Sequence, residues 1–293
     1  MFCNFKTTTH GKWILAGEHS VLRGHGALVF PISNRQLILR YNASNSDLAA
    51  NYSGESGADL HLLFWGVLEQ GAQILNQSLN DLNGNFHLEC NIPIGVGMGA
   101  SAALCVATAR WFCAQKILEQ EQVFDFSKQL ENLFHGESSG LDIAGVSNPS
   151  GMYFTKKHRC TITPKWQPLW YLSSCEQISI TSHCIGQVKT LWSENPKKAG
   201  AIDKHMSDSV EQARKALANT TTGSHIQLAH AINQAGACFE QWGLVTESLE
   251  QHMKALRDAG AVAVKPTGSG SGGHVISLWD KEPTGTSIQL TKL

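Results

Sequence analysis

The stretch Pro93-Ile94-Gly95-Val96-Gly97-Met98-Gly99-Ala100-Ser101 decides the fold, because it joins a strand pattern to a helix pattern through a glycine loop. Before it, residues 86–92 alternate between apolar and polar side chains, which is typical of a half-buried strand. After it, residues 100–118 are rich in alanine and other apolar side chains and contain no glycine or proline, which predicts a buried helix. The predicted order is therefore strand, glycine loop, helix.

This loop has the composition of a phosphate-binding turn. Glycines allow backbone N–H groups to face an anion, and the N terminus of the following helix adds its dipole and its free amides. Ser101 lies in the first helical turn, where its hydroxyl could reach a metal bound to phosphate. A tight strand–helix turn that binds nothing fits the same spacing. The loop is not a Walker A loop, because GxxxxGK[ST] does not occur in the chain.

A second glycine loop, residues 268–273, contains GxGxxG, the spacing of dinucleotide-binding turns. Such turns require an acidic residue about 20 positions later. The chain ends there in Thr-Ser-Ile-Gln-Leu-Thr-Lys-Leu, without an acid. A dehydrogenase is therefore disfavoured.

Apolar periodicity outlines the rest of the chain. It predicts strands at 13–16, 27–32, 36–41, 177–181 and 274–279, and helices at 60–75, 125–134, 203–218, 226–242 and 247–259. The polar segment 156–168 contains two prolines and is the predicted boundary between two domains, residues 1–160 and 161–293.

Composition excludes several classes of protein. The chain has 293 residues, of which 42% are hydrophobic, and its formal net charge of -1 gives no basic field for nucleic acid or a membrane surface. Its start shows no signal-peptide pattern, and no apolar run approaches the ~20 residues needed to span a bilayer. The eight cysteines form no CxxC pair, and HExxH does not occur. We therefore expect a cytoplasmic protein with reduced thiols and without structural zinc.

Three further groups of polar residues have no single meaning by themselves. Lys12 follows a glycine and precedes an apolar strand; alone it would be a solvated lysine. Glu18 and His19 follow the same strand, and each alone would be a turn residue. Glu131 lies four residues before the segment His-Gly-Glu-Ser-Ser-Gly-Leu, residues 135–141, and Asp142 follows that segment. Asp142 alone would most simply be a helix N-cap.

In combination, these segments resemble the motifs of the GHMP kinases, a family that includes galactokinase, homoserine kinase, mevalonate kinase and phosphomevalonate kinase. The three matching segments are residues 10–24, 93–103 and 265–273, in the order that the family shows. Within the family, the first segment resembles GKxILxGEHxVxxG and residues 131–142 resemble ExxxHGxxSGxD, both patterns of the mevalonate kinases. The resemblance extends from residue 10 to about residue 279.

The resemblance implies a two-domain α+β fold, with an N-terminal domain of the ribosomal-S5 domain 2 type, which binds ATP, and a ferredoxin-like C-terminal domain. It implies that ATP and Mg²⁺ are the cofactors and that mevalonate, a small-molecule alcohol, is phosphorylated to 5-phosphomevalonate in the route to isoprenoids. It leaves open whether the chain forms a homodimer.

The resemblance also assigns roles to residues of this chain. Asp142 and Lys12 would be catalytic, and Ser101 and Glu131 would hold the metal. The nucleotide would be bound by Pro93, Gly95, Val96, Gly97, Met98, Gly99, Ala100 and Ser101. The acceptor alcohol would be bound by Glu18, His19, Ser139, Gly140 and Thr267.

The chain departs from the family pattern at several positions. Ala100 stands where a first serine is usual, Thr9-His10 replaces Ala-Pro, Pro266 and Ser271 interrupt the last loop, and Glu137-Ser138 replaces Asn-Pro. Two alternatives therefore stay open: another GHMP kinase, such as a phosphomevalonate or sugar kinase, and a non-catalytic relative that binds ligands. A phosphorylated acceptor would need additional Lys or Arg side chains, for which Arg23 and Lys189 are available.

Overall fold

The computed structural model describes residues 2–135 and 138–293, so Gly136 and Glu137 of the predicted acidic segment lie outside the described residues. The chain forms two compact units. The first contains Met1–Lys12 and Pro31–Pro149, and the second contains Trp13–Phe30 and Ser150–Leu293. The predicted division after residue 160 differs from this one, because it falls within a strand of the second unit, Arg159–Ile162.

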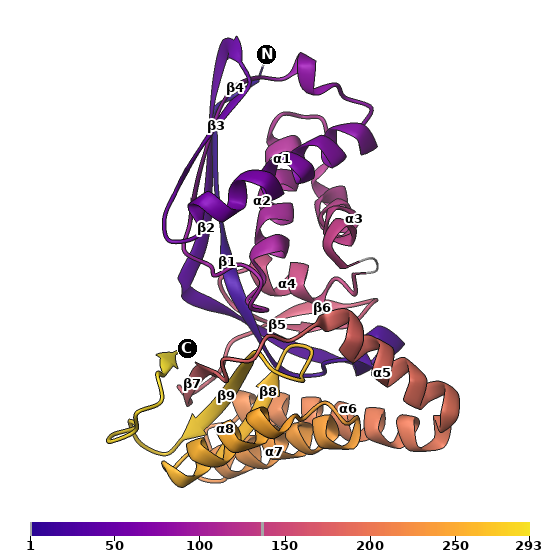
Figure 1. Ribbon diagram of the computed structural model, residues 1–293, viewed down its shortest axis with the longest axis vertical. Helices are drawn as coiled ribbons and strands as arrows, with labels where there is room; N and C mark the ends of the chain where they lie inside the picture. Colours follow the sequence, from indigo (N-terminus) through magenta and orange to yellow (C-terminus); the bar gives the residue numbers. More distant parts are fainter. Residues whose placement is uncertain (1, 136–137) are drawn as a thin grey trace. The chain divides into compact units, whose positions relative to one another are not determined.

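The first unit is a sheet with helices on one of its faces (Figure 1). The strands run in the order β3-β4-β2, with β1 also paired to β2, and β1 and β2 continue along the chain into the second unit. The strands are β1 (Phe5–Ala16), β2 (Ala27–Asp47), β3 (Ala49–Ser53) and β4 (Asn83–Cys90). The helices are α1 (Gly57–Ile74), α2 (Ala100–Ala114), α3 (Val123–His135) and α4 (Leu141–Ser147).

The predicted alternation of residues 86–92 is confirmed in β4. Phe86, Leu88 and Cys90 are buried, and the residues between them are partly exposed. Their partners across the antiparallel pairing with β2 are Tyr41, Leu39 and Leu37, all buried. Helix α2, which contacts α1, α3 and α4, is buried along nearly its whole length, as its alanine-rich sequence predicts.

The second unit contains an antiparallel sheet in the order β10-β7-β9-β8. Its strands are β7 (Leu169–Ser174), β8 (Ala263–Thr267), β9 (His274–Trp279) and β10 (Thr291–Lys292). The start of β2 pairs with β5 (Gly151–Phe154), which pairs with β6 (Arg159–Ile162). The helices are η1 (Ser20–Arg23), α5 (Thr181–Glu194), α6 (Pro196–Ala218), α7 (Ser224–Gln241) and α8 (Glu247–Asp258).

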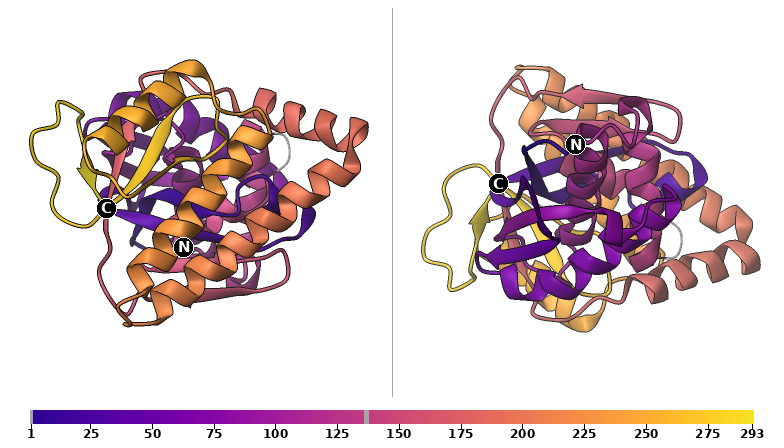
Figure 2. Two further views of the ribbon diagram at one scale, coloured as in Figure 1. Left: turned by 90° about the horizontal axis from the view of Figure 1, so that it is seen from below. Right: turned by 90° about the horizontal axis from the view of Figure 1, so that it is seen from above.

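Helix α8 covers the sheet of the second unit with an apolar face (Figure 2). Leu249, Met253 and Leu256 pack with Val275 and Trp279 of β9 in one buried cluster. The spacings of four and then three residues between Leu249, Met253 and Leu256 place these apolar side chains on one stripe of the helix. The mixture of helices with sheets whose strands pair antiparallel, apart from the parallel pair β3–β4, confirms the predicted α+β class.

The strand predicted at residues 177–181 is wrong. Apolar residues do alternate there, but Ile178 is 82% exposed and residues 177–180 belong to neither a helix nor a strand. The carbonyl of Gln177 instead accepts a hydrogen bond from the backbone of Gly273 at 2.7 Å, and α5 begins at Thr181. Over the described part of the chain, no helix is both long and apolar enough to cross a membrane.

Candidate active site

Lys12 and Asp142 form an ion pair in the first unit. Lys12 Nζ lies 2.9 Å from Asp142 Oδ1. The lysine side chain is only 4% exposed, whereas the aspartate is 31% exposed, so the carboxylate remains accessible from one side. Lys12 lies on β1 and Asp142 in the first turn of α4, so two segments distant in sequence supply one charged pair.

Asp142 is not the N-cap of its helix. Gly140, with φ of 84°, holds that position, and the preceding hydroxyls satisfy the first backbone amides. Ser138 Oγ accepts from the N–H of Gly140 at 3.0 Å, and Ser139 Oγ accepts from the N–H of Leu141 at 3.1 Å. The capping role that Asp142 alone suggested is therefore excluded, and its carboxylate is left to Lys12.

The glycine loop leads from the end of β4 into α2. Gly95, Gly97 and Gly99 all have φ between 80° and 83°, a conformation that side chains other than glycine rarely adopt. A Cβ atom at Gly95 or Gly97 would meet nothing within 4 Å, so a ligand can approach this backbone closely. A Cβ at Gly99 would lie 2.8 Å from Lys12 Cγ, so this glycine is required where the loop meets Lys12. The loop and Lys12 are thus adjacent.

Glu131 is a buried carboxylate on α3, only 2% exposed. Burial, and after it the negative charge of Asp142, raise its pKa to about 8. The hydroxyl of Ser138 donates a hydrogen bond to Glu131 Oε2. The charge of Glu131 in turn raises the pKa of the buried Cys105 thiol, after the larger effect of burial. Cys105 lies one helical turn after Ser101 on α2, so Glu131 faces the part of α2 that carries Ser101.

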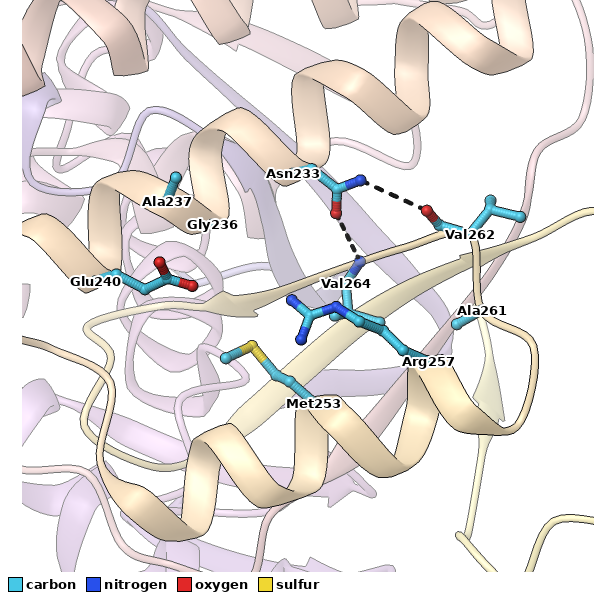
Figure 3. A pocket seen from close by; sticks show the side chains of 9 residues that line it. All are labelled: Asn233, Gly236, Ala237, Glu240, Met253, Arg257, Ala261, Val262 and Val264. Carbon is cyan, nitrogen blue, oxygen red and sulfur yellow. Dashed lines mark hydrogen bonds between the residues drawn. The ribbon is translucent and has the colours of Figure 1, made fainter.

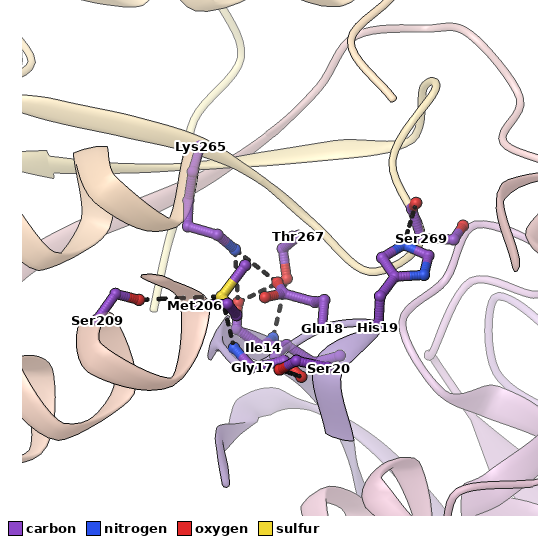
Figure 4. A network of polar contacts seen from close by, with 10 residues as sticks. All are labelled: Ile14, Gly17, Glu18, His19, Ser20, Met206, Ser209, Lys265, Thr267 and Ser269. Atoms are coloured by element: carbon purple, nitrogen blue, oxygen red, sulfur yellow. Dashed lines mark hydrogen bonds and ion pairs between the residues drawn. The ribbon is translucent and has the colours of Figure 1, made fainter. Parts of the chain in front are cut away.

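In the second unit, Glu18 is paired with Lys265 (Figure 4). Lys265 Nζ lies 2.5 Å from Glu18 Oε1, and the two side chains are 0% and 2% exposed. Lys265 Nζ also lies 3.4 Å from the carbonyl of Ile14 and 5.2 Å from the ring centre of Phe239. The Glu18 carboxylate, predicted to bind the acceptor, is thus buried within its own unit.

His19 follows with a backbone conformation that is unusual for a residue with a side chain, φ 57° and ψ -48°. Its Nε2 lies 2.8 Å from the carbonyl of Ser269, and its ring makes edge contacts with Phe239 and Trp242. Burial lowers its pKa to about 4, so the ring is neutral at pH 7. A neutral ring that faces a carbonyl carries its proton on Nε2, which we assign from this hydrogen bond and which leaves Nδ1 as an acceptor.

Thr267, also predicted to bind the acceptor, uses its hydroxyl within the second unit. Its Oγ1 donates to the carbonyl of Ile14 at 2.9 Å and accepts from the N–H of Ile14 at 2.9 Å. The side chain therefore holds β1 beside β8, and its one hydroxyl proton is already committed.

The second unit also contains a cavity of about 330 Å³, which is separate from the residues predicted for the active site (Figure 3). Helices α7 and α8 and strand β8 enclose it. Its lining includes Asn233, Glu240, Met253 and Arg257, and none of the predicted site residues. Within residues 2–135 and 138–293, no cluster of three or more His, Cys, Asp or Glu side chains could hold a metal ion.

The sequence reasoning missed the contacts of two residues near the predicted site, Ser138 and Lys265. Lys265 belongs to the third matching segment, but nothing in the sequence shows that it pairs with Glu18, 247 positions away. Ser138 was noted only as a departure from the family pattern. Glu137, the other half of that departure, lies outside the described residues.

Comparison with known proteins identifies the family. The GHMP kinase N-terminal domain model matches residues 63–147, and the GHMP kinase C-terminal model matches residues 213–289. The mevalonate kinase of Archaeoglobus fulgidus is 27% identical over 283 residues, which cover 95% of this chain and 94% of the relative. That of Thermococcus onnurineus is 26% identical, with coverages of 96% and 90%.

A solved structure shows the same fold. The L. major mevalonate kinase in complex with R-mevalonate matches with a TM-score of 0.78 at 21% identity, covering 94% of this chain and 87% of that chain. The two family models include the second and third motif segments, residues 93–103 and 265–273, and the first segment, residues 10–24, lies outside both matches. The chain belongs to the GHMP kinase family.

Proposed function

We propose that this protein is a mevalonate kinase, which transfers the γ-phosphoryl group of ATP to the terminal hydroxyl of mevalonate. ATP as the donor follows from membership of a kinase family. The observation that carries the proposal is the Lys12–Asp142 pair beside the glycine loop, at 2.9 Å. The curated relatives, which match along nearly the whole chain and are named mevalonate kinases, support mevalonate as the acceptor.

Asp142 is proposed to take the proton of the acceptor hydroxyl as the bond to phosphorus forms. An alcohol is a poor nucleophile until that proton leaves, and a carboxylate within hydrogen-bond reach can accept it. Lys12 keeps this carboxylate oriented and supplies positive charge close to the transferring group. The 31% exposure of Asp142 leaves room for an alcohol beside it.

The residues around Glu131 fit a magnesium ion. Mg²⁺ is usually held by one or two carboxylates together with water and substrate phosphates, so the lack of a three-residue cluster among the described side chains is no obstacle. Burial and the neighbouring Asp142 raise the pKa of Glu131, and a divalent cation would relieve this repulsion. Glu131 and the hydroxyl of Ser101 would hold the ion, which would neutralise the phosphate charge during transfer.

Gly95 to Ser101 are proposed to bind the phosphates through backbone N–H groups and the start of α2. On the acceptor side, His19 is proposed to accept a hydrogen bond from the substrate through Nδ1, and Ser139 and Gly140 remain proposed substrate-binding residues. Glu18 and Thr267 are proposed to act indirectly, because their polar groups already bind Lys265 and Ile14.

A phosphorylated acceptor is less well supported than mevalonate. It would need cationic side chains that are free to bind a second phosphate. Arg23 is paired with the buried Asp203, with Nη2 2.6 Å from Oδ1, and its guanidinium lies 5.2 Å from the ring centre of Trp192. Arg23 is therefore already committed within the second unit.

The test is ADP release by the purified protein with Mg-ATP and, in turn, mevalonate, phosphomevalonate, homoserine and galactose. The highest kcat/KM is expected with mevalonate. Preference for phosphomevalonate or galactose would overturn the acceptor but not the family, and no turnover with any alcohol would favour a ligand-binding relative.

The eight free cysteines agree with a reducing compartment, and we infer that the protein is located in the cytoplasm.

A further inference from the structure

Arg110 lies on α2 and binds two other elements of the first unit. Its Nη1 donates to the carbonyl of Thr8 at 3.0 Å and to Thr7 Oγ1 at 3.2 Å, both on β1. Its Nη2 donates to the carbonyl of Ser147, the last residue of α4, at 2.5 Å. One side chain therefore joins β1, α2 and α4.

The same three elements carry the groups proposed for the reaction. Lys12 lies on β1, Ser101 on α2 and Asp142 on α4. At the other end of α2 they also meet, because a Cβ at Gly99 would lie 2.8 Å from Lys12 Cγ and 3.1 Å from Val146 Cγ1. Gly99 and Arg110 are separated by about 16 Å of helix, so α2 is fixed to β1 and α4 at two separate points.

Helix α4 depends on such external contacts. It has seven residues, too few for a helix to be stable alone, and its last carbonyls have no partner within the helix. The guanidinium of Arg110 satisfies the Ser147 carbonyl, and positive charge is favourable at a helix C terminus. The buried side chains of α4 pack it against α2 and α3, but the contact with Arg110 links its last carbonyl to β1. Without this contact the C-terminal end of α4 can shift, which moves Asp142 on the same short helix.

We propose that Arg110 is a positioning residue, which keeps Asp142 at hydrogen-bond distance from Lys12 by tying the C terminus of α4 to β1. The kinetic consequence rests on the proposed function, whereas the tie itself does not. A displacement of about 1 Å in a reacting group can cost ~10²-fold in rate, so loss of the tie should appear mainly in kcat.

The test compares Arg110→Gln and Arg110→Lys with the control Arg40→Gln. Arg40 belongs to the same unit, but its pair with Glu89 is exposed, with Nη1 3.0 Å from Oε2. In Arg110→Gln, the amides of residues 143–147 should exchange hydrogen at least about 10-fold faster. Its kcat per folded molecule should fall at least about 10-fold, with the KM for ATP within about 2-fold of wild type. Arg110→Lys should restore part of kcat, and the control should change neither quantity.

A second comparison separates positioning from a general loss of structure. In an Asp142→Asn background, Arg110→Gln should lower kcat by less than about 2-fold, because both act through the same group. An equal loss in both backgrounds, or unchanged exchange in α4, would overturn the inference. If Arg110→Gln does not fold, Arg110→Lys carries the same two measurements. If the wild-type protein phosphorylates no alcohol, the proposed function fails, and hydrogen exchange still decides whether Arg110 ties α4.

Discussion

Replacing Lys265 with methionine removes the positive partner of a fully buried ion pair. Lys265 and Glu18 are 0% and 2% exposed, and their charged atoms are 2.5 Å apart. Methionine is close to lysine in length, and its thioether can take the place of the ammonium group beside the Phe239 ring, so the change removes charge and little volume. Glu18 then keeps its buried carboxylate without the ammonium group that balances it.

The expected loss follows from this burial. Breaking one partner of a buried pair costs roughly 3–5 kcal/mol, because the remaining charge stays desolvated. At roughly 3 °C per kcal/mol for a unit of this size, the thermal midpoint of the second unit should fall by about 10 °C. Removing both charges, as in Glu18→Gln/Lys265→Met, should recover more than half of that loss, since no unbalanced charge remains.

Tryptophan fluorescence measured during urea or thermal unfolding reports on the second unit, because six of the eight tryptophans lie in it. The matched control is Lys204→Met, which breaks an exposed pair with Asp208 at 2.8 Å and should change stability by less than about 1 kcal/mol. Equal effects of Lys265→Met and Lys204→Met would refute the reasoning, and so would a double variant less stable than Lys265→Met alone.

Three further predictions concern the site. Asp142→Asn should lower kcat at least about 10²-fold. Any loss of stability should come from Lys12, which is 4% exposed and loses its partner, and not from the helix cap, which Gly140 provides. Activity within a few-fold of wild type would remove Asp142 from the mechanism. Ser101→Ala and Glu131→Gln should raise the Mg²⁺ concentration needed for half-maximal ADP release, and a loss that no Mg²⁺ concentration relieves would indicate a structural role. The pKa of His19 falls from 6.5 to about 4 on burial, so between those values the unfolded chain binds a proton that the folded chain does not. Acidification from pH 7 to 5 should therefore cost wild type about 2 kcal/mol more than His19→Asn, and equal losses in urea titrations would contradict this.

Apolar periodicity correctly predicted those helices and strands whose apolar faces find a partner in the folded structure. The alternation of residues 86–92 and the alanine-rich run after Gly99 are each buried as their periodicity requires. Residues 177–181 alternate equally well, but no strand pairs with them, so their pattern had no partner to stabilise it. Pairing is a property of distant segments, which periodicity does not contain.

The candidate site likewise contains residues that the sequence predicted and contacts that it could not predict. Lys12, the glycine loop and Asp142 were predicted from motif resemblance, and the Lys12–Asp142 contact agrees with that expectation. The partners of Glu18 and Thr267 could not be predicted, because Lys265 and Ile14 each lie about 250 positions away from them in the sequence. Arg110 lies in a helix whose sequence predicts only burial. Its proposed positioning role depends on hydrogen bonds to the carbonyls of Thr8 and Ser147, which the sequence does not reveal.

The interleaving of the two units has a consequence for how the chain is made. Trp13–Phe30 is synthesised before Pro31–Pro149, yet it belongs with Ser150–Leu293, which is synthesised after Pro31–Pro149. Until then Trp13 and Phe30 lack Trp170, whose ring centre lies 4.8 Å and 5.4 Å from theirs, and the start of β2 lacks β5. An apolar segment left waiting during synthesis invites aggregation or capture by a chaperone. The segment that holds Glu18 and His19 therefore gains these partners only after Trp170 has been synthesised, and a nascent chain stalled at residue 160 would lack Trp170.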